Sequence, residues 1–231
     1  MIEVEPGTVV VFSDIGCPWA HLAVFRLHRA RAELGLEREI TFDHRAFPLE
    51  LFNERPTPKK TLDAEFAVVG ALDPDAGWQM WQRPEFEYPV TTLLALEAVQ
   101  AAKRQSLRAG EELDRALRIA FFGESRTISM RHVILDVARG CPSLDTTALA
   151  DDLDHGSSRI DVMEQQRVAE TEDVQGSPHV FLPDGTNEPN PGIAMEWEGS
   201  HGVGFPVVHE DRPKVYIDLL QRAADHDEAG R

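Results

Sequence analysis

The spacing of hydrophobic positions predicts a strand, a helix and a second strand at the start of the chain. Residues 8–12 form the β-branched and aromatic run TVVVF, which is typical of a buried strand. Over residues 18–34 the apolar side chains recur at helical spacing, and Gly35 follows as a helix-ending glycine. Apolar and polar side chains then alternate over residues 40–46, as in a strand. A β-α-β unit of this kind implies a parallel pair of strands.

The middle of the chain changes to helical spacing. From about residue 58 to residue 171 almost every periodic segment repeats at three and four residues, most clearly over 113–121. Ser129 and Asp145 each precede a further helical segment and are candidate helix N-caps. We therefore expect this stretch to form a block of helices.

Strand signals return after the helical block. Residues 179–182 form the short apolar run HVFL, which ends at a Pro-Asp-Gly turn. Residues 186–205 are rich in Gly, Pro and Asn and show no regular pattern apart from one candidate strand at 195–198. A last helix is expected to begin at Arg212 or Pro213.

These patterns predict an α/β protein in which the two outer parts of the chain share one domain. Residues 1–55 and 172–231 supply the strands of that domain. Residues 56–171 form an α-helical subdomain inserted between them.

Composition and charge narrow the class of protein. The chain has 231 residues, of which 42% are hydrophobic and 27% charged, as in ordinary globular domains. Its formal net charge of -17 repels phosphate backbones and anionic lipids, so we expect no nucleic-acid partner and no membrane partner. No apolar run approaches the roughly 18 residues of a membrane span, and the first residues lack the features of a secretory signal. Together with the presence of only two cysteines, this predicts a reducing, cytoplasmic location.

The strongest chemical signal is Cys17, which lies at the junction of the first strand and the first helix. A cysteine at a helix N-terminus faces unpaired N–H groups and the positive end of the helix dipole, and both favour the thiolate. Helix N-termini can lower a cysteine pKa from about 8.5 to roughly 3.5–7.5, so the position predicts a reactive sulfur. Pro18 would stiffen the turn, Trp19 would shield one flank, and His21 would add positive charge if it were protonated and faced the sulfur. The competing interpretation is an inert buried cysteine.

The second signal is the sequence Gly-Ser-Pro at residues 176–178, directly before the strand at 179–182. Ser177 and Pro178 could form a tight turn with a cis X–Pro bond, opposite the cysteine. On its own, an ordinary loop proline is the more common explanation. The order of the two motifs around a helical block strengthens the functional interpretation.

These motifs together resemble the DsbA family of the thioredoxin-like superfamily, which carries a helical insertion. The matching segments are VVVFSDIGCPW at 9–19, FFGESRTIS at 121–129 and VQGSPHVF at 174–181. The resemblance implies a thioredoxin-like fold and the activity of a thiol–disulfide oxidoreductase. It also implies that Cys17 is the nucleophile, and that Pro18, Trp19, Ser177 and Pro178 contact the substrate.

One departure from the family pattern changes the expected mechanism. The family motif is C-x-x-C, but this chain has Cys-Pro-Trp-Ala, with Ala20 at the position of the second cysteine. Cys17 is therefore expected to act as a monothiol, forming a mixed disulfide that a second thiol from solution resolves. Cys141 is a less favoured resolving thiol. A third interpretation is a thioredoxin-fold protein that has lost redox activity and binds a partner.

A different enzyme class also fits the fold. The kappa-class glutathione transferases and the hydroxychromene-carboxylate isomerases share it, carry a Ser-Pro motif in place of Cys17-Pro18, and use a small-thiol cofactor. The main expectation is a disulfide-containing protein or small molecule as substrate, no tightly bound cofactor, a low-molecular-weight thiol as co-substrate, and a monomer or homodimer. No His or Cys spacing suggests a metal site.

Two further groups carry weaker signals. Asp43, His44 and Arg45 could border the cleft, although a surface triplet is the more common case. The aromatic side chains between the helices could line a groove for an apolar ligand, but such residues more often fill a domain interface; they are Trp78, Trp81, Phe86 and Tyr88.

Overall fold

The computed structural model describes residues 2–171, 174–200 and 203–229. Its first three elements are β1 (Thr8–Ser13), α1 (Pro18–Leu34) and β2 (Thr41–Ala46), as the hydrophobic pattern predicts. β1 and β2 pair in parallel, with Thr8 opposite Thr41. Gly35 ends α1 in the left-handed conformation at φ 71°, which a residue without a Cβ adopts at little cost.

The central sheet has four strands in the order β2-β1-β3-β4. β3 (His179–Phe181) runs antiparallel to β1, and β4 (Asn187–Pro189) runs antiparallel to β3. β3 thus brings the chain back to the centre of the sheet after the helical block. This pairing places the turn before β3 beside the loop after β1.

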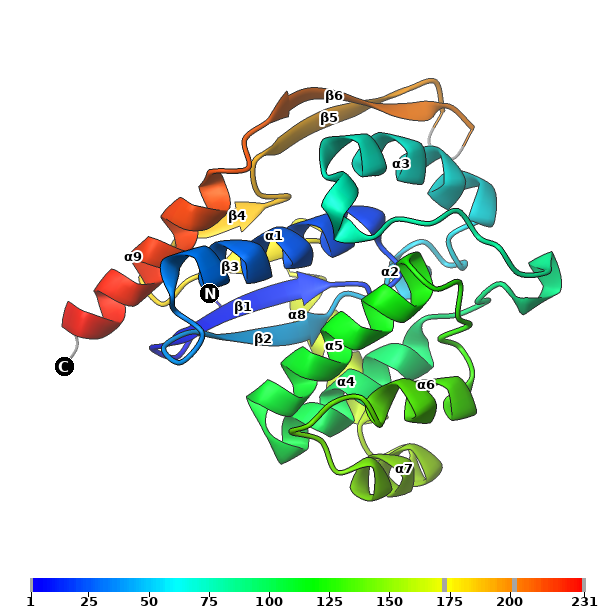
Figure 1. The fold of residues 1–231 in the computed structure, drawn as a ribbon, viewed down its shortest axis with the longest axis horizontal. Coiled ribbons are helices and arrows are strands. Elements are labelled where there is room, and N and C mark those ends of the chain that lie inside the picture. Colours follow the sequence, from blue (N-terminus) through cyan, green and yellow to red (C-terminus); the bar gives the residue numbers. More distant parts are fainter. Residues whose placement is uncertain (1, 172–173, 201–202, 230–231) are drawn as a thin grey trace.

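Helices cover both faces of the sheet (Figure 1). On one face, α1 packs with α9 (Val215–Ala229) over Val9 and Val11 of β1. On the other face, Val10 and Phe12 share a buried cluster with Ala169 at the end of α8 (Arg159–Ala169). Because successive strand residues point to opposite faces, the continuous apolar run of β1 fills both layers.

The described elements between β2 and β3 are all helices or 3₁₀ turns. A short α2 (Leu49–Phe52) is followed by α3 (Lys59–Leu72), two 3₁₀ turns (Pro74–Ala76 and Glu85–Glu87), α4 (Leu93–Gln105), α5 (Leu107–Phe122), α6 (Arg131–Ala138), α7 (Thr146–His155) and α8. The buried aliphatic and aromatic side chains of α4 to α7 form one cluster, to which α3 contributes Leu62 and Phe66. α5 lies along β2, where the Glu111 carboxylate accepts the Phe42 N–H at 2.9 Å and so satisfies a donor of the edge strand.

The structure corrects three details of the predicted elements. The region after β4 contains a separate hairpin of β5 (Ile193–Glu198) and β6 (Phe205–Asp211), of which only part of β5 is predicted by pattern. The last helix begins at Val215, not at Arg212 or Pro213. Asp145 caps α7 as predicted, accepting the N–H groups of Thr147 and Ala148, whereas the predicted Ser129 cap is wrong because α6 begins after Met130.

The β5–β6 hairpin lies over α3, and both pack near the start of α1 (Figure 1). Ile193, Met195 and Val208 of the hairpin contact a buried cluster that contains Cys17, Trp19 and Val69. This hairpin, most of which the sequence pattern does not predict, therefore helps to bury the predicted nucleophile.

Candidate functional site

Cys17 occupies the N-cap position of α1, at the end of the loop that follows β1. Its backbone is extended at φ -83° and ψ 119°, and the first helical residue is Pro18, whose missing N–H would have had no helical partner. The thiol is only 4% exposed, and its Sγ–H donates to the Ser177 carbonyl oxygen at 3.2 Å. Two motifs separated by 160 residues therefore meet at one sulfur atom.

A second contact fixes the turn at Ser177 and Pro178 against the loop that carries Cys17. The Ser177–Pro178 peptide bond is cis, and Ser177 Oγ accepts the N–H of Asp14 at 2.9 Å. On the far side of the turn, the Pro178 carbonyl accepts the Asn190 N–H at 2.8 Å. The structure thus brings together Cys17, Ser177 and Pro178.

Asp14 holds the loop from within. One carboxylate oxygen accepts the Gly16 N–H at 2.8 Å, and the other accepts the Leu49 N–H at 2.9 Å and the Thr92 hydroxyl at 3.1 Å. Burial raises the pKa of Asp14, while these hydrogen bonds oppose the rise. The carboxylate therefore connects the loop, α2 and the start of α4.

Arg118 of α5 supports the same loop from below. Its guanidinium is 1% exposed, donates to the Asp14 carbonyl at 3.0 Å and to Ser13 Oγ at 2.8 Å, and pairs with Asp114 at 2.7 Å. Neither Asp14 nor Arg118 is among the predicted site residues. Asp14 lies within the motif that resembles the DsbA family, but Arg118 is an unremarkable helix residue in the sequence.

The predicted low pKa of Cys17 is wrong for this structure. The pKa of the thiol is raised to about 12, chiefly by burial and next by the charge of Glu65. The hydrogen bonds with Ser177 and with the Ala20 backbone lower the pKa, but by less. The helix N-terminus does supply a donor, yet the loss of hydration around a charged sulfur outweighs it.

Trp19 flanks the cysteine and connects it to the helical block. The indole is 6% exposed, and its Nε1–H donates to the Glu65 carboxylate of α3 at 3.1 Å. Burial raises the pKa of Glu65 to about 7, against the hydrogen bond from Trp19. Sequence patterns could not identify this contact, because it depends on how α3 lies against α1.

His21 does not supply the positive charge considered above. It is 4% exposed, its Nε2 lies 2.9 Å from the Ala76 carbonyl, and its ring stacks on Phe122. Burial lowers its pKa to about 4, so the ring is neutral at physiological pH. It acts as a hydrogen-bonded core residue.

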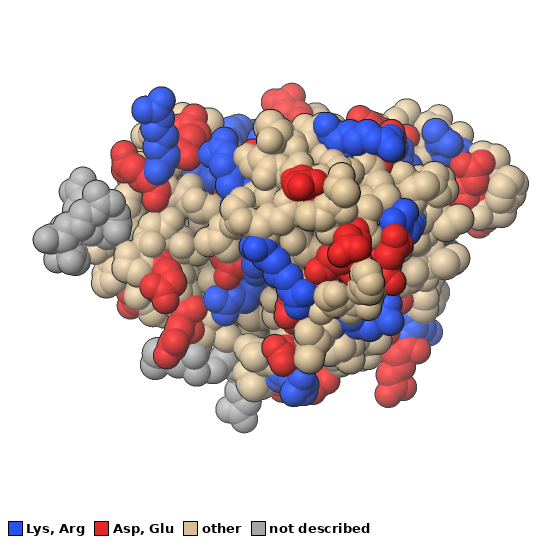
Figure 2. Space-filling model, turned by 90° about the horizontal axis from the view of Figure 1, so that it is seen from below, with Lys and Arg blue, Asp and Glu red and all other residues tan. Residues whose placement is uncertain are grey.

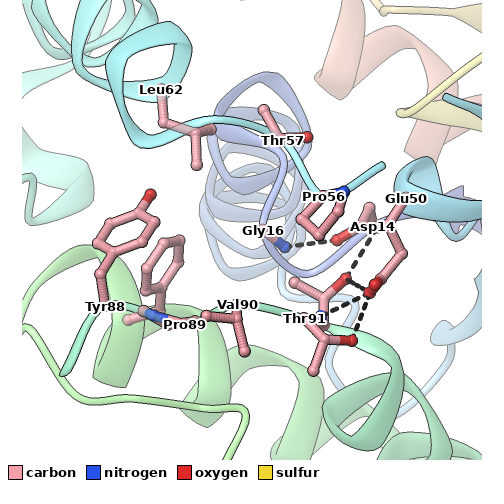
Figure 3. A pocket seen from close by; sticks show the side chains of 12 residues that line it. Asp14, Gly16, Glu50, Pro56, Thr57, Leu62, Tyr88, Pro89, Val90 and Thr91 are labelled. Carbon is pink, nitrogen blue, oxygen red and sulfur yellow. Dashed lines mark hydrogen bonds between the residues drawn. The ribbon is translucent and has the colours of Figure 1, made fainter. Parts of the chain in front are cut away.

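A pocket opens beside Gly16, the residue before the cysteine (Figure 3). It lies between the loop of Gly16, the segment of Pro56 and Thr57, and residues 88–92. On one side Glu50 Oε1 accepts the Thr91 hydroxyl at 2.7 Å and the Thr92 N–H at 2.8 Å, which caps the start of α4. On the other side stand Tyr88 and Leu62 (Figure 3). The pocket is thus a mixed polar and apolar cavity next to the cysteine loop.

The four candidate aromatic residues separate into different roles. Trp78 packs among His21, Phe66 and Phe122 in the interior. Trp81 and Tyr88 contact each other and Phe121, and Tyr88 also lines the pocket. Phe86 is 87% exposed.

The remaining candidates lie away from the sulfur. Cys141 is a buried free cysteine in the cluster formed by α4 to α7, which does not include Cys17. Asp43 pairs with Arg45 at 2.8 Å and with Lys103, and His44 is buried near Asp114. Among the described residues, no group of three or more His, Cys, Asp or Glu side chains could hold a metal ion.

On the face seen in Figure 2, the charged side chains do not gather into separate acidic and basic patches. Acidic and basic side chains lie interspersed there, with tan surface between them. In the described part of the chain, no helix combines the length and the apolar character that crossing a membrane requires.

A comparison with known protein families finds one that matches this chain. The sequence profile of the DSBA-like thioredoxin domain matches residues 8–201. A search of curated protein sequences finds no match.

Several solved structures share the fold at low sequence identity. The cytosolic disulfide reductase DsbM from Pseudomonas aeruginosa, solved with GSH, superposes with a TM-score of 0.63 at 14% identity, covering 96% of this chain and 98% of that one. A probable DsbA oxidoreductase from Streptomyces coelicolor gives 0.65 at 19% identity, covering 94% and 89%. A 2-hydroxychromene-2-carboxylate isomerase gives 0.59 at 16% identity, covering 78% and 87%. These likenesses confirm the predicted fold class, a thioredoxin-like fold with a helical insertion.

Proposed function

The chain belongs to the DSBA-like thioredoxin domain family, and from that premise we propose that it is a monothiol thiol–disulfide oxidoreductase acting through Cys17. One observation carries the proposal, namely the 3.2 Å contact between Cys17 Sγ and the carbonyl of Ser177. In this arrangement a sulfur bound to Cys17 lies beside backbone groups that can pair with an extended substrate. Ser177 and Pro178 are the proposed substrate turn, and Pro18 and Trp19 the proposed flanking wall.

The proposed reaction has two exchange steps. Cys17 Sγ attacks one sulfur of a substrate disulfide, the substrate S–S bond breaks, and the other sulfur leaves as a thiol after taking up the proton that Cys17 loses. A second thiol then attacks the mixed disulfide and releases Cys17. Because Ala20 stands where a second cysteine would resolve the intermediate, the resolving thiol comes from solution.

A low-molecular-weight thiol in the cytoplasm is the proposed co-substrate. The absence of an internal resolving cysteine in the motif favours this, and the structural neighbour solved with GSH is described as cytosolic. Disulfide-containing proteins and small disulfides are the proposed substrates. Residues 1–55 with 172–231 would form the thioredoxin-like domain, and 56–171 the helical insertion.

The burial of Cys17 favours a second candidate function. A thiol whose pKa lies at about 12 stays protonated at neutral pH and can donate a hydrogen bond. In an isomerase or transferase that uses a small-thiol cofactor, such a donor would stabilise the cofactor's thiolate without reacting. The pocket beside Gly16 would then face the substrate.

A mass measurement separates these functions. The protein is incubated with oxidised glutathione, and the monothiol mechanism predicts one glutathione adduct that maps to Cys17 and is removed by excess reduced glutathione. Cys17→Ser should abolish the adduct, whereas Cys141→Ser should leave it unchanged. Absence of the adduct in the wild type would refute the monothiol mechanism.

Calorimetry with reduced glutathione completes the test. If the Cys17→Ser variant binds reduced glutathione as tightly as the wild type, and no adduct forms, the cofactor-dependent isomerase or transferase is favoured. If neither protein binds glutathione and no adduct forms, a thioredoxin-fold binding protein without redox activity remains.

A further inference from the structure

We propose that the β5–β6 hairpin is a gate over Cys17, and that its strands move away from α3 about the base of the hairpin to admit a disulfide to the sulfur. This inference rests on the proposed thiol–disulfide function, because it names the element that regulates access to the same cysteine. Cys17 is 4% exposed in this structure. A substrate sulfur can therefore bond to Cys17 Sγ only after part of the cover has moved.

The hairpin is separate from the central sheet. β5 and β6 pair with each other in a two-stranded sheet, whereas the four-stranded sheet ends at β4. Figure 1 shows the hairpin extending over α3, and β6 packs against this helix. The hairpin can therefore move without breaking the hydrogen bonds of the central sheet, as a local opening of the kind that folded proteins undergo.

The inner face of the hairpin is apolar and lies on the cluster that contains the cysteine. Ile193, Met195 and Val208 pack against the buried residues of this cluster, which are Cys17, Trp19, Ala20, Leu22 and Val69. Met195 and Val208 are directly opposed in the hairpin, so both side chains project from the same face. Because apolar contacts are not directional, this face can separate from the cluster at a cost set by the area that it exposes to water.

Charged side chains of the hairpin pair with each other inside the hairpin. His209 lies 3.1 Å from Glu196, and Arg212 pairs with Glu210 at 3.1 Å. Glu196 lies opposite Val207, on the face that points away from Met195 and Val208. These ion pairs move with the hairpin and are kept when it opens.

The base of the hairpin provides the point about which it moves. The Arg212 N–H donates to the Gly192 carbonyl at 2.8 Å, where the chain enters and leaves the hairpin. Gly192 has a φ of 72°, and a Cβ there would lie 2.6 Å from the Arg212 carbonyl oxygen, so this close approach requires glycine. Arg26 of α1 pairs with Asp211 at 2.6 Å and so fixes the end of β6. The base is thus held by polar bonds, whereas the inner face is held by apolar packing.

Opening of the gate explains how a buried sulfur can act as a nucleophile. Burial is the largest cause of the raised pKa of Cys17, and water returns to the sulfur when the hairpin leaves the cluster. The N-terminus of α1 then acts on a hydrated thiol and favours the thiolate. The closed state therefore protects the sulfur, and the open state is the reactive one.

Two neighbouring valines test the gate by the rate at which iodoacetamide alkylates Cys17 in a Cys141→Ser background. Val207 and Val208 are both partly buried, but Val208 packs against the cysteine cluster and Val207 lies on the opposite face. At about pH 7.5, Val208→Ala should be alkylated about tenfold faster than the parent, because the closed state loses apolar contacts. Val207→Ala should stay within about twofold of the parent rate. Equal acceleration by the two substitutions, or none by Val208→Ala, overturns the gate.

The urea dependence of the same reaction distinguishes movement of the hairpin from unfolding of the whole chain. In dilute urea the logarithm of the Cys17 labelling rate should rise with less than about half the slope of global unfolding, because opening exposes one face only. Hydrogen exchange of the β5 and β6 amides should show the same weak dependence, whereas β1 should follow global unfolding. Labelling of Cys17 with the slope of β1 overturns the gate. This measurement keeps both valines, so it decides the question even if Val208→Ala does not fold.

Oxidised glutathione separates failure of the gate from failure of the proposed function. If Val208→Ala accelerates alkylation and Val207→Ala does not, but neither variant nor the parent forms a glutathione adduct, the gate is supported and the oxidoreductase function is overturned. If the parent forms the adduct at Cys17 but both variants are alkylated at the parent rate, the oxidoreductase function stands and the gate is overturned.

Discussion

Two effects shift the pKa of the Cys17 thiol in opposite directions. The N-terminus of α1 favours a charged sulfur, whereas enclosure by Trp19 and by the β5–β6 hairpin disfavours it. In this structure the effect of enclosure is the larger one. Cys17 is 4% exposed, and the pKa of its thiol is raised to about 12. Position in the chain predicts the first effect only, since the second depends on residues far away in sequence.

We therefore predict that Cys17 reacts more slowly with small alkylating agents in the folded protein than in the unfolded chain. In a Cys141→Ser variant at about pH 7.5, iodoacetamide should label the folded chain at least about a hundredfold more slowly than the urea-unfolded chain. The physical reason is that the folded thiol forms far less thiolate. Mass spectrometry over time gives both rates, and faster labelling of the folded protein would mean that the thiol is activated rather than suppressed.

The loop between β1 and α1 is held in place by α5. No sequence pattern connects this helix with the loop. Arg118 of α5 is fully buried and binds Asp114, Ser13 Oγ and the Asp14 carbonyl. Such a charge is tolerated inside the protein only because every partner is in place. The loop geometry at Cys17 thus depends on the helical block.

Arg118→Met should lower the free energy of unfolding by about 3–5 kcal/mol, because Asp114 is left buried without its main partner. Urea denaturation at neutral pH measures the loss. Arg108→Met on the same helix removes an exposed pair with Glu112 and should cost less than about 1 kcal/mol. Adding Asp114→Leu to Arg118→Met should recover part of the stability, since an apolar pair replaces the unpaired charge. A loss no larger than that of the Arg108 variant would show that the buried pair is not needed.

The local sequence pattern predicts the central strands and α1 well, and it predicts the outer β5–β6 hairpin less well. β1, α1 and β2 follow from clear periodicity, and the Asp145 cap follows from a side chain that can accept backbone N–H groups. β6 escapes prediction because its burial alternates only weakly and Pro206 lies within it. The meeting of Cys17 with Ser177 is implied by the family resemblance, but the hydrogen bond from Trp19 to Glu65 depends on the observed packing of α3 against α1.

The pH dependence of stability sums over groups in different parts of the molecule. His21 is neutral when folded, with a pKa of about 4, so the unfolded chain takes up a proton below about pH 6.5 and stability is lost as the pH falls. The pKa values of His28 and His44 are also lowered, chiefly by burial, and act in the same direction. Glu65 acts in the opposite direction, because its pKa of about 7 lies above that of an unfolded glutamate.

Between about pH 4.5 and 7 the unfolded chain releases the Glu65 proton while the folded chain retains it, so Glu65 makes the protein less stable as the pH rises. The difference of about 2.5 in pKa corresponds to about 3 kcal/mol. Glu65→Gln removes this loss of stability with rising pH, because glutamine does not titrate. The free energy of unfolding of the variant, relative to the wild type, should therefore increase by about 3 kcal/mol between pH 4.5 and 7, as measured by urea denaturation across that range. A relative stability of Glu65→Gln that stays flat with pH would mean that the Glu65 carboxyl titrates in the folded protein as it does in the unfolded chain.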